Sequence, residues 1–296
     1  DFQSEITNEI MSARLEKAKN AVIPGFYGAT EEGRVVTFSR GGSDVTGSIV
    51  ARATKAKLYE NWTDVSGCLI CDPRIVNNPE PIKTITYREL RELAYMGATV
   101  LHEDAIFPVR AAGIPVNIKN TNQPEDRGTM IVSESAEHCD HIITGIAGKK
   151  GMSVINIEKD KMNSEIGFGK NVLRALEKSN VSFEHMPSGV DTMSVVIATE
   201  ALAGKETAII DEIKSRVHPD QIYIESNLAL IAVVGRGMKS ARGTAAILFS
   251  ALADARVNIK MIDQGSSELN IIVGVEEEDF EVAIKAIYKR FIGINQ

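Results

Sequence analysis

Hydrophobic positions over residues 1 to 135 recur in short runs, separated by amphipathic stretches and glycine-rich turns. The predicted strands and helices of this part are, in chain order, residues 35–38, 43–57, 87–96 and 114–118. Thr86 precedes the second helix and Glu89 follows three residues later, which is the spacing of a capping box. Strands that alternate with helices in this way predict an α/β domain, a parallel sheet covered by helices.

Two polar stretches follow the last of these strands. Residues 120–128 contain Pro124 and Gly128 and are rich in side chains that favour turns. We expect this stretch to be the exit from the first domain, and residues 133–140 to be a linker.

From residue 141 onward the chain contains an internal repeat. When the sequence is shifted by 76 positions, Val154 falls on Leu230 and Gly189 falls on Gly265 without a gap. The second copy predicts strands at residues 228–234, 258–263 and 268–275, and helices at residues 244–254 and 279–291. Each copy has the order of a βαββαβ unit, an α+β sandwich with its helices on one face. Chance similarity between two amphipathic patterns is the alternative, and the matching glycines argue against it.

Charge and composition narrow the class of protein. The net charge of −7 argues against a nucleic-acid or anionic-membrane partner, because such partners are bound by concentrated Lys and Arg. No apolar run approaches the ~20 residues that a membrane helix needs. The first residues lack the basic start and apolar stretch of a signal peptide, and three cysteines are too few for a disulfide framework. We therefore predict a cytoplasmic protein with no nucleic-acid or membrane partner.

Residues 39–44, with the sequence SRGGSD, lie between a predicted strand and a predicted helix. Two glycines let the backbone approach a ligand closely, and a helix that begins at Ser43 and Asp44 offers free N–H groups to an anion. Arg40 adds a guanidinium group suited to a carboxylate or a phosphate. The alternative is a glycine turn capped by Ser43 or Asp44, with Arg40 in solvent.

A second polar stretch follows a predicted strand. Thr63 and Asp64, and then Arg74 beyond Pro73, place acids and a guanidinium group in loops that could contact a nucleotide and its magnesium. A pair of turns shaped by Gly67 and Pro73 is the alternative.

Cysteine and histidine residues give little evidence of chemistry. Cys68 and Cys71 form a single CxxC pair, which cannot close a tetrahedral zinc site without a second pair, so we predict ordinary packing. His138, Cys139 and His141 cluster in the linker without further ligands. His102 follows an apolar stretch and is predicted to be packed. We predict no metal site built by the protein alone.

Taken in order, four segments resemble the C-terminal half of the catalytic domain of aspartate kinases. They are VTFSRGGSDVTGSIVARA (36–53), NWTDVSGCLICDPRIV (61–76), ITYRELRELAYMGATVLHEDAI (85–106) and IPVNIKNTNQPEDRGTMIV (114–132). Each 76-residue unit is similar to an ACT domain, the sensor that these kinases carry in tandem, and QGSSELNIIV (264–273) resembles their second ACT module. The resemblance implies a partial amino-acid-kinase sheet with helices on both faces, followed by two ACT modules packed side by side.

The resemblance also implies domain bounds. Residues 1–135 would be the C-terminal part of the catalytic domain. The first ACT module, residues 152–227, would be inserted into the second, which comprises residues 141–151 and 228–296. A homodimer that forms through the ACT modules is expected.

Site residues follow from the motifs that match. Arg40 would hold the carboxylate of substrate aspartate and Asp44 its ammonium group, and both are the implied catalytic residues. The implied substrate-binding loop is Arg40, Gly41, Gly42, Ser43 and Asp44. Thr63, Asp64 and Arg74 would line the ATP site. The implied reaction transfers the γ-phosphoryl group of ATP, with Mg²⁺ bridging the phosphates, to the β-carboxylate of aspartate. This step leads to lysine, threonine and methionine.

Lysine is the effector that the resemblance favours, with threonine second. The implied effector residues are Met162, Glu165, Phe168, Gly169, Ser182, Phe183 and Glu184. The N–H groups at a helix start near Gly167 favour an α-carboxylate, and Glu184 could pair with an ammonium group. A solvent-facing strand residue is the alternative for Glu184.

Relatives begin with a lysine-bearing KFGG-like strand, which these residues do not include, so we expect the chain by itself to be inactive. Two other classes of function stay open at this point. One is a non-catalytic amino-acid-sensing subunit, and the other is another kinase of the amino-acid-kinase fold.

Overall fold

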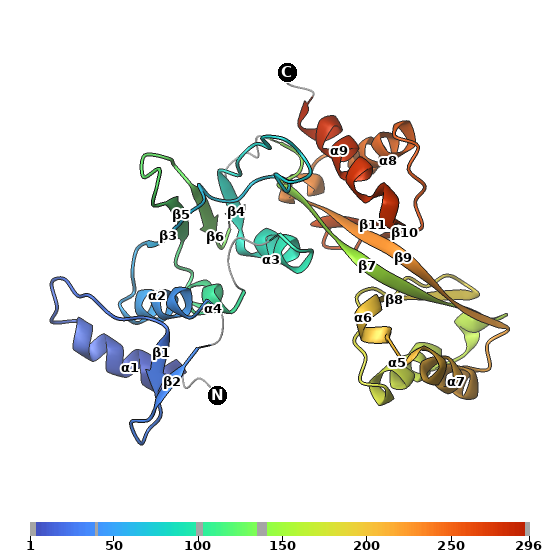
Figure 1. Cartoon of the computed structure of the whole chain (residues 1–296), viewed down its shortest axis with the longest axis horizontal. Coiled ribbons are helices and arrows are strands. Elements are labelled where there is room, and N and C mark those ends of the chain that lie inside the picture. The colour runs from blue at the N-terminus through green and yellow to red at the C-terminus, as the bar shows by residue number, and fades with distance from the viewer. Residues whose placement is uncertain (1–3, 39–40, 99–102, 135–140, 294–296) are drawn as a thin grey trace. The chain divides into compact units, whose positions relative to one another are not determined.

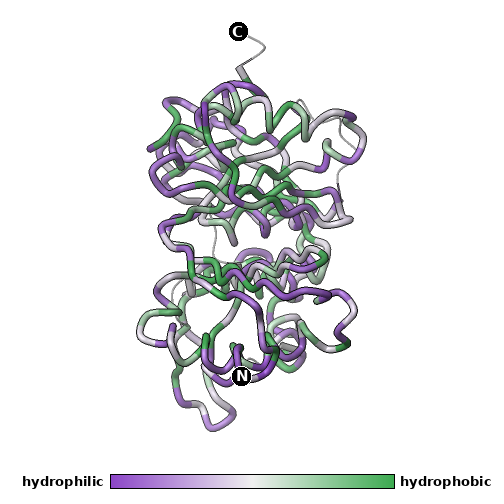
Figure 2. The backbone as a smooth tube through the Cα atoms, turned by 90° about the vertical axis from the view of Figure 1, so that its right-hand side faces the viewer, coloured by the Kyte–Doolittle hydropathy of each residue, from purple (hydrophilic) through white to green (hydrophobic). Residues whose placement is uncertain are grey.

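The computed structural model describes residues 4–38, 41–98, 103–134 and 141–293 (Figure 1). The chain forms two compact units. The first comprises Asp1–Ala147 and Val234–Gly237, and the second comprises Gly148–Val233 and Met238–Gln296. Figure 2 shows hydrophobic stretches of backbone that are interrupted by hydrophilic turns, as expected for chains that bury one face of each element. Within the part of the chain that the structure describes, no helix has the length and apolar content that crossing a membrane requires.

The first unit begins with a helix and a hairpin. Helix α1 (Ser4–Leu15) is followed by β1 (Tyr27–Ala29) and β2 (Val35–Thr37), which pair antiparallel. Strand β2 confirms the strand predicted at residues 35–38. Helix α2 (Gly42–Ala53) confirms the helix predicted next and ends four residues before the predicted end.

A four-stranded sheet forms the centre of the first unit. Its strands are β3 (Tyr59–Thr63), β5 (Val116–Asn120), β6 (Thr129–Val132) and β4 (Thr84–Thr86), in that order across the sheet. Pairs β3–β5 and β4–β6 are parallel, whereas β5–β6 is antiparallel. The sheet is therefore mixed, and the prediction of a parallel sheet is correct for only two of its three pairs.

The antiparallel pair also corrects the interpretation of residues 120–128. This polar stretch connects β5 to β6 within one sheet and is not an exit from the domain. A connection this short allows only antiparallel pairing, because a parallel crossover needs a dozen or more residues. Turn composition alone does not distinguish a hairpin from a domain boundary.

Helices pack beside this sheet. Helix α3 (Tyr87–Tyr95) has the capping box that the sequence predicts at Thr86 and Glu89. Helix α4 (Glu103–Ala111) packs against α2 (Figure 1). The buried Ser48 hydroxyl of α2 accepts a hydrogen bond from the backbone N–H of Val109 in α4, at 3.2 Å.

The second unit contains a five-stranded sheet with the order β10-β11-β9-β7-β8. The bounds of its strands are β7 (Gly145–Glu158), β8 (Thr192–Ala198), β9 (Gln221–Val234), β10 (Met261–Asp263) and β11 (Asn270–Glu276). Strands β7 and β9 have 14 residues each. Both are longer than the strand predicted at residues 228–234, because β9 begins with the exposed and half-buried residues 221–227 and β7 continues through residues 149–151.

Helices of the second unit form two pairs. Helix α5 (Phe168–Lys178) packs against α7 (Glu206–Val217), and α8 (Thr244–Asp254) packs against α9 (Phe280–Phe291). A short helix α6 (Thr199–Leu202) and the 3₁₀ turns η1 (Met162–Ser164) and η3 (Glu277–Asp279) also lie in this unit, whereas the 3₁₀ turn η2 (Arg236–Lys239) begins in the first unit and ends in the second.

The structure confirms the repeat. A shift of 76 residues places β7 on β9 and α5 on α8, with no difference at either end. Gly167 and Gly243 precede the two helices with φ angles of 86° in both cases, a left-handed conformation that favours glycine. The first copy encloses a core that includes Ile155, Val172 and Ile213.

One predicted strand is incomplete. The alternative interpretation of Glu184 implies a strand around that residue, but residues 181–186 are joined to β8 only by an isolated bridge between His185 and Val196. Backbone hydrogen bonds on either side of this bridge run from Glu184 N to Val196 O and from Val196 N to His185 O. The α/β and α+β classes are thus confirmed. The domain bounds proposed at residues 135, 141, 152 and 228 stay predictions.

Candidate functional site

The described part of the SRGGSD segment forms the start of α2. Gly41 precedes the helix with a φ of 74°, in the left-handed region. A Cβ atom at Gly42 would lie 2.7 Å from the ring of Phe26 and 2.8 Å from Cβ of Phe38. Close packing of the two aromatic residues therefore requires glycine at position 42. Arg40, the implied ligand of the substrate carboxylate, lies outside the described residues.

Asp44 lies in the first turn of α2 and is held by strand β3. The Asn61 side-chain amide donates to Asp44 Oδ1 at 3.0 Å, and the Tyr59 hydroxyl donates to the Asp44 backbone carbonyl at 3.3 Å. Asn61 is buried, and burial raises the pKa of Tyr59. These contacts fix the Asp44 carboxylate at a helix N-terminus, where a negative charge is favoured and where it could pair with a cationic group.

Asn61 and Tyr59 were not identified from the sequence. The available signal was their spacing, because residues i and i+2 of a strand face the same side. They precede Thr63 on the strand that the TDVSG motif follows, so alternate positions before that motif were the place to search.

Thr63 and Asp64 come together at the carboxyl end of β3. The Thr63 hydroxyl donates to Asp64 Oδ1 at 3.2 Å. Thr63 pairs with Asn120 of the parallel neighbour β5, and both the N–H and the hydroxyl of Thr121 donate to the Thr63 carbonyl, at 2.8 and 2.6 Å. Ligands of open α/β sheets bind at this edge, outside the carboxyl ends of parallel strands.

More polar groups gather at the same edge. The Asn120 amide donates to Ser66 Oγ at 2.9 Å, and Ser66 Oγ donates to Asp126 Oδ2 at 2.5 Å. The Lys119 ammonium group lies 5.5 Å from the centre of the Trp62 ring. Asn120 and Asp126 were missed because the 120–128 stretch was interpreted as a domain exit. Their position directly after a strand was the usable signal.

Arg74 has a partner within its own turn. Its guanidinium group forks onto Asp72, with Nη2 2.6 Å from Oδ2. The Arg74 side chain is 85% exposed, and its hydrogen bonds lower the pKa of Asp72. The structure thus brings Thr63 and Asp64 together and places Arg74 on a neighbouring turn.

The implied effector residues divide into two groups. Met162 and Phe168 are buried in the core of the first repeat, so only their backbone groups are available to a ligand. The Glu165 carboxylate forms an ion pair with Lys159, whose ammonium group also donates to the carbonyl of Val217.

The Glu184 side chain is largely shielded from solvent and already has a charged partner. Its side chain is 17% exposed and lies 2.6 Å from the Lys149 ammonium group. The alternative of a solvated strand residue is therefore wrong. Ser182 and Phe183 beside it are exposed, and the next residue, His185, contacts Asp263 through Nδ1 at 2.8 Å.

Comparison with known proteins identifies the family. The amino acid kinase family matches residues 2–120, and the ACT domain matches residues 231–291. Aspartokinase 3 of Bacillus subtilis (strain 168) is 45% identical over 280 residues, which are 94% of this chain and 62% of that protein. The crystal structure of Clostridium acetobutylicum aspartate kinase is 57% identical with a TM-score of 0.92, and covers 98% of this chain and 67% of that one. The chain belongs to the aspartate kinase family.

Two crystal structures of E. coli aspartokinase III, which this chain also resembles, contain bound ligands. The complex with aspartate and ADP, an R-state, is 27% identical with a TM-score of 0.71 over 90% of this chain and 59% of that one. The complex with lysine and aspartate, a T-state, is 25% identical with a TM-score of 0.75 over 98% and 64%. This chain spans about three-fifths of the length of the curated relative named above.

The burial of the cysteines supports the prediction that they serve ordinary packing. Cys68 and Cys71 are buried, and burial raises their pKa values to about 12 and about 11. A thiol with so high a pKa is a poor nucleophile and metal ligand at neutral pH. In the described ranges no three His, Cys, Asp or Glu side chains gather as they would around a metal ion. His102, His138 and Cys139 lie outside those ranges.

Proposed function

We propose that this chain carries the nucleotide-binding part of the catalytic domain, and the amino-acid-sensing region, of an aspartate kinase. The reaction transfers the γ-phosphoryl group of ATP to the β-carboxylate of L-aspartate. Similarity to aspartate kinases over nearly the whole chain is the observation that carries this proposal. Asp44, fixed at a helix start by Asn61, supports it as an anionic group that suits the substrate's ammonium.

Phosphoryl transfer depends on positioning and on neutralising charge, so few side chains need to react. In this proposal Arg40 and Asp44 orient aspartate, and Thr63, Asp64 and Arg74 contact the nucleotide. Mg²⁺ enters with ATP and neutralises phosphate charge. The exposed Asp64 carboxylate, at the carboxyl edge of β3, is an oxygen ligand of the kind that Mg²⁺ takes beside phosphates.

The activity is tested by aspartyl-hydroxamate formation from aspartate and Mg-ATP, measured on the full reading frame that contains these residues. We expect product that depends on aspartate, and a loss of at least about 100-fold in kcat/KM for Asp44→Asn, since an ion pair to the substrate is removed. The control is Asp211→Asn, a change at an exposed position of α7. Product from glutamate in place of aspartate would refute the proposed substrate.

We also propose that lysine is the effector and that its ammonium group binds Glu184. E. coli aspartokinase III is described in complex with lysine, which supports this choice. In our structure an ammonium group already occupies this position, because Lys149 lies 2.6 Å from Glu184. Glu165 is likewise paired with a lysine of the chain, Lys159. Free lysine therefore has to displace an internal partner before it binds.

Replacing Lys149 by glutamine is expected to tighten lysine binding. A partly exposed ion pair contributes at most about 1 kcal/mol, so its removal should lower the dissociation constant by roughly threefold to fivefold. Isothermal titration calorimetry of the 296-residue chain with lysine measures this change. Lys150→Gln is the matched control, because Lys150 is exposed and lies over the Phe280 ring at 5.3 Å. Weaker binding to the Lys149 variant would show that Lys149 assists the effector and does not compete with it.

Two further properties are proposed on the strength of the family alone. We place the protein in the cytoplasm and expect a homodimer formed through the ACT modules. Sedimentation of the purified chain with and without lysine tests the dimer, and a monomer under both conditions would contradict it.

A further inference from the structure

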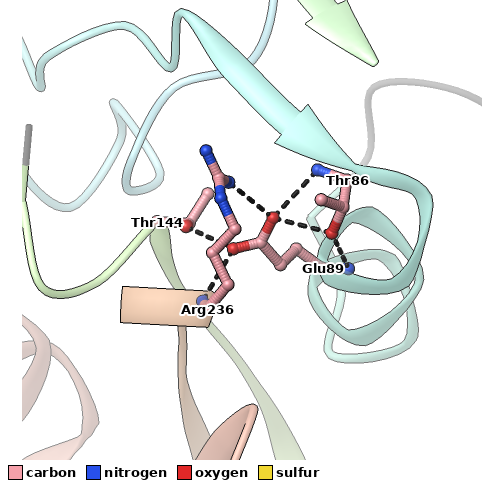
Figure 3. A network of polar contacts seen from close by, with 4 residues as sticks. All are labelled: Thr86, Glu89, Thr144 and Arg236. Atoms are coloured by element: carbon pink, nitrogen blue, oxygen red, sulfur yellow. Dashed lines mark hydrogen bonds and ion pairs between the residues drawn. The ribbon is translucent and has the colours of Figure 1, made fainter. Parts of the chain in front are cut away.

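Glu89 is a fully buried carboxylate with partners from three separate parts of the chain (Figure 3). Within α3 and its cap, it accepts hydrogen bonds from the N–H and the hydroxyl of Thr86, at 2.9 and 2.7 Å. Its other partners are the Thr144 hydroxyl at 2.6 Å, and the backbone N–H and Nη1 of Arg236 at 2.8 and 2.9 Å. A capping box needs only the bond from the Thr86 N–H, together with the bond that the Glu89 N–H donates to the Thr86 hydroxyl, so the other contacts require another explanation.

All of these partners belong to the first unit, but two of them adjoin the second. The chain passes between the units after residues 147, 233 and 237. Thr144 lies three residues before the first passage, and Arg236 lies between the second and the third. Glu89 therefore binds residues next to every point at which the two units are covalently joined.

Residues 234–237, the segment that carries Arg236, pack tightly against residues 141–144. A Cβ atom at Gly235 would lie 2.6 Å from the Ile143 Cα, and one at Gly237 would lie 2.6 Å from the Ile142 carbonyl oxygen. The Thr144 N–H donates to the Val234 carbonyl at 2.7 Å. Backbone atoms on both sides make these contacts, so residues 234–237 and 142–144 move together.

The repeat gives this segment a counterpart. A shift of 76 residues places Arg236 on Asp160, in the loop between β7 and α5 that leads into the implied effector residues Met162 to Gly169. The same loop of the second copy, between β9 and α8, contains the arginine that binds Glu89. In the proposed function the strand-to-helix loop of the first copy binds the effector, whereas the same loop of the second copy binds Glu89 of the first unit.

We propose that the Glu89–Arg236–Thr144 cluster couples the sensing region to the catalytic half-domain, by tying the start of β7 and the end of β9 to the start of α3. This inference rests on the proposed function for the identity of the effector. A displacement of β7 or β9 reaches Thr144 or Arg236 through a few peptide bonds. Release of Arg236 would leave the buried Glu89 carboxylate without a counter-charge, and release of Thr144 would remove one of its hydrogen bonds, so α3 follows.

A route from α3 to the substrate loop is present within the first unit. Helix α3 packs on α4, and α4 packs on α2. The Val109–Ser48 hydrogen bond joins α4 to α2, whose first turn carries Asp44. Coupling of this kind needs a direct test, because proximity alone does not demonstrate it.

The test is hydrogen–deuterium exchange of peptides covering residues 84–96 in the 296-residue chain, with and without saturating lysine. In the unmodified chain we expect lysine to change the exchange rate by about threefold or more. The uncoupled variant is Glu89→Gln combined with Arg236→Gln, which removes both charges together and so leaves no buried charge unpaired. It should bind lysine within about twofold of the unmodified chain but show no lysine-dependent change at 84–96. Arg242→Gln, an exposed arginine of the following turn, is the matched control and should respond like the unmodified chain.

A second experiment tests the coupling without an effector. Ile287→Val removes one methyl group from the buried face of α9 and loosens the second unit. It should speed exchange at residues 84–96 by about threefold in the unmodified background, but not in the double variant. If titration shows that neither lysine nor threonine binds, the effector assignment fails and this experiment still decides the coupling. Persistence of either effect in the double variant, or the absence of both from the unmodified chain, would overturn the inference.

Discussion

Replacing Glu89 by alanine is expected to lower the free energy of unfolding of the first unit by about 3–5 kcal/mol. The change leaves Arg236, whose side chain is only 18% exposed, without a counter-charge. It also leaves the backbone N–H groups of Thr86 and Arg236 without the carboxylate that accepts their hydrogen bonds. Urea denaturation followed by fluorescence measures the loss, because Trp62 is the single tryptophan and lies in the first unit.

Arg88→Ala is the control for helix α3. Arg88 follows the same cap but is exposed, so its replacement should change stability by less than about 0.5 kcal/mol. Similar losses for the two variants would show that the helix, and not the buried cluster, determines the effect.

Acid should remove the contribution of Glu89. Burial acts to raise the pKa of this carboxyl group, but hydrogen bonds from Thr144, Thr86 and Arg236 outweigh burial and hold the pKa below its ordinary value of 4.5. A folded-state pKa below the unfolded value means that the stabilisation is present above the unfolded pKa. It is lost as the pH falls through the folded pKa. The stability difference between the unmodified chain and Glu89→Gln should therefore shrink below about pH 4. A difference that is constant between pH 7 and pH 3 would show that folding does not change the pKa of Glu89.

Glu89 also shows how far the sequence predicts this structure. Its capping contact with Thr86 spans three residues, so the pattern of a serine or threonine followed by glutamate was enough to locate it. Its partners Thr144 and Arg236 are 55 and 147 residues away. No local pattern encodes a contact over such distances, so the half of the cluster that joins separate segments had to come from the fold.

The same distinction between local patterns and long-range contacts applies to the helices and strands. The repeat predicted the helices α5 and α8 because glycine, helix start and apolar spacing are all local features. The length of β7 and β9 was not predicted, because each strand includes polar, partly exposed residues (149–151 in β7 and 221–227 in β9) whose pattern does not indicate a strand. The hairpin at residues 120–128 was misread, since β6 is only four residues long and its partner is set by tertiary pairing.

For the candidate site, motifs located Asp44, Thr63 and Asp64 but not their supports. Asn61 holds Asp44 from a different element, and an asparagine in a strand matches no motif. The implied effector carboxylates Glu165 and Glu184 were also expected to be available. The structure pairs both with lysines of the chain, a property of the packed structure that residue type does not reveal.

Replacing Gly128 by alanine is expected to lower the free energy of unfolding of the first unit by about 3 kcal/mol or more. Gly128 ends the hairpin between β5 and β6 with a φ of 72°, and a Cβ atom there would lie 1.9 Å from the Ile118 carbonyl oxygen. The clash is with backbone, so it can be relieved only by separating the pair of Ile118 and Thr129. Trp62 pairs with Lys119 across β3 and β5, and its fluorescence in urea reports the loss directly.

Gly113→Ala separates backbone strain from the clash. Gly113 precedes β5 in the same unit, with a φ of 67°, but the nearest atom to an added Cβ is the Ser133 hydroxyl at 3.9 Å. This variant suffers only the strain of a left-handed residue, about 1–2 kcal/mol. The difference between the two variants is therefore the contribution of close packing in the hairpin that carries Asn120 and Thr121 to the edge beside Thr63. Equal losses of stability in the two variants would mean that β6 can move away from β5 at little cost in free energy. The polar edge would then owe its geometry to β3 and β5 alone.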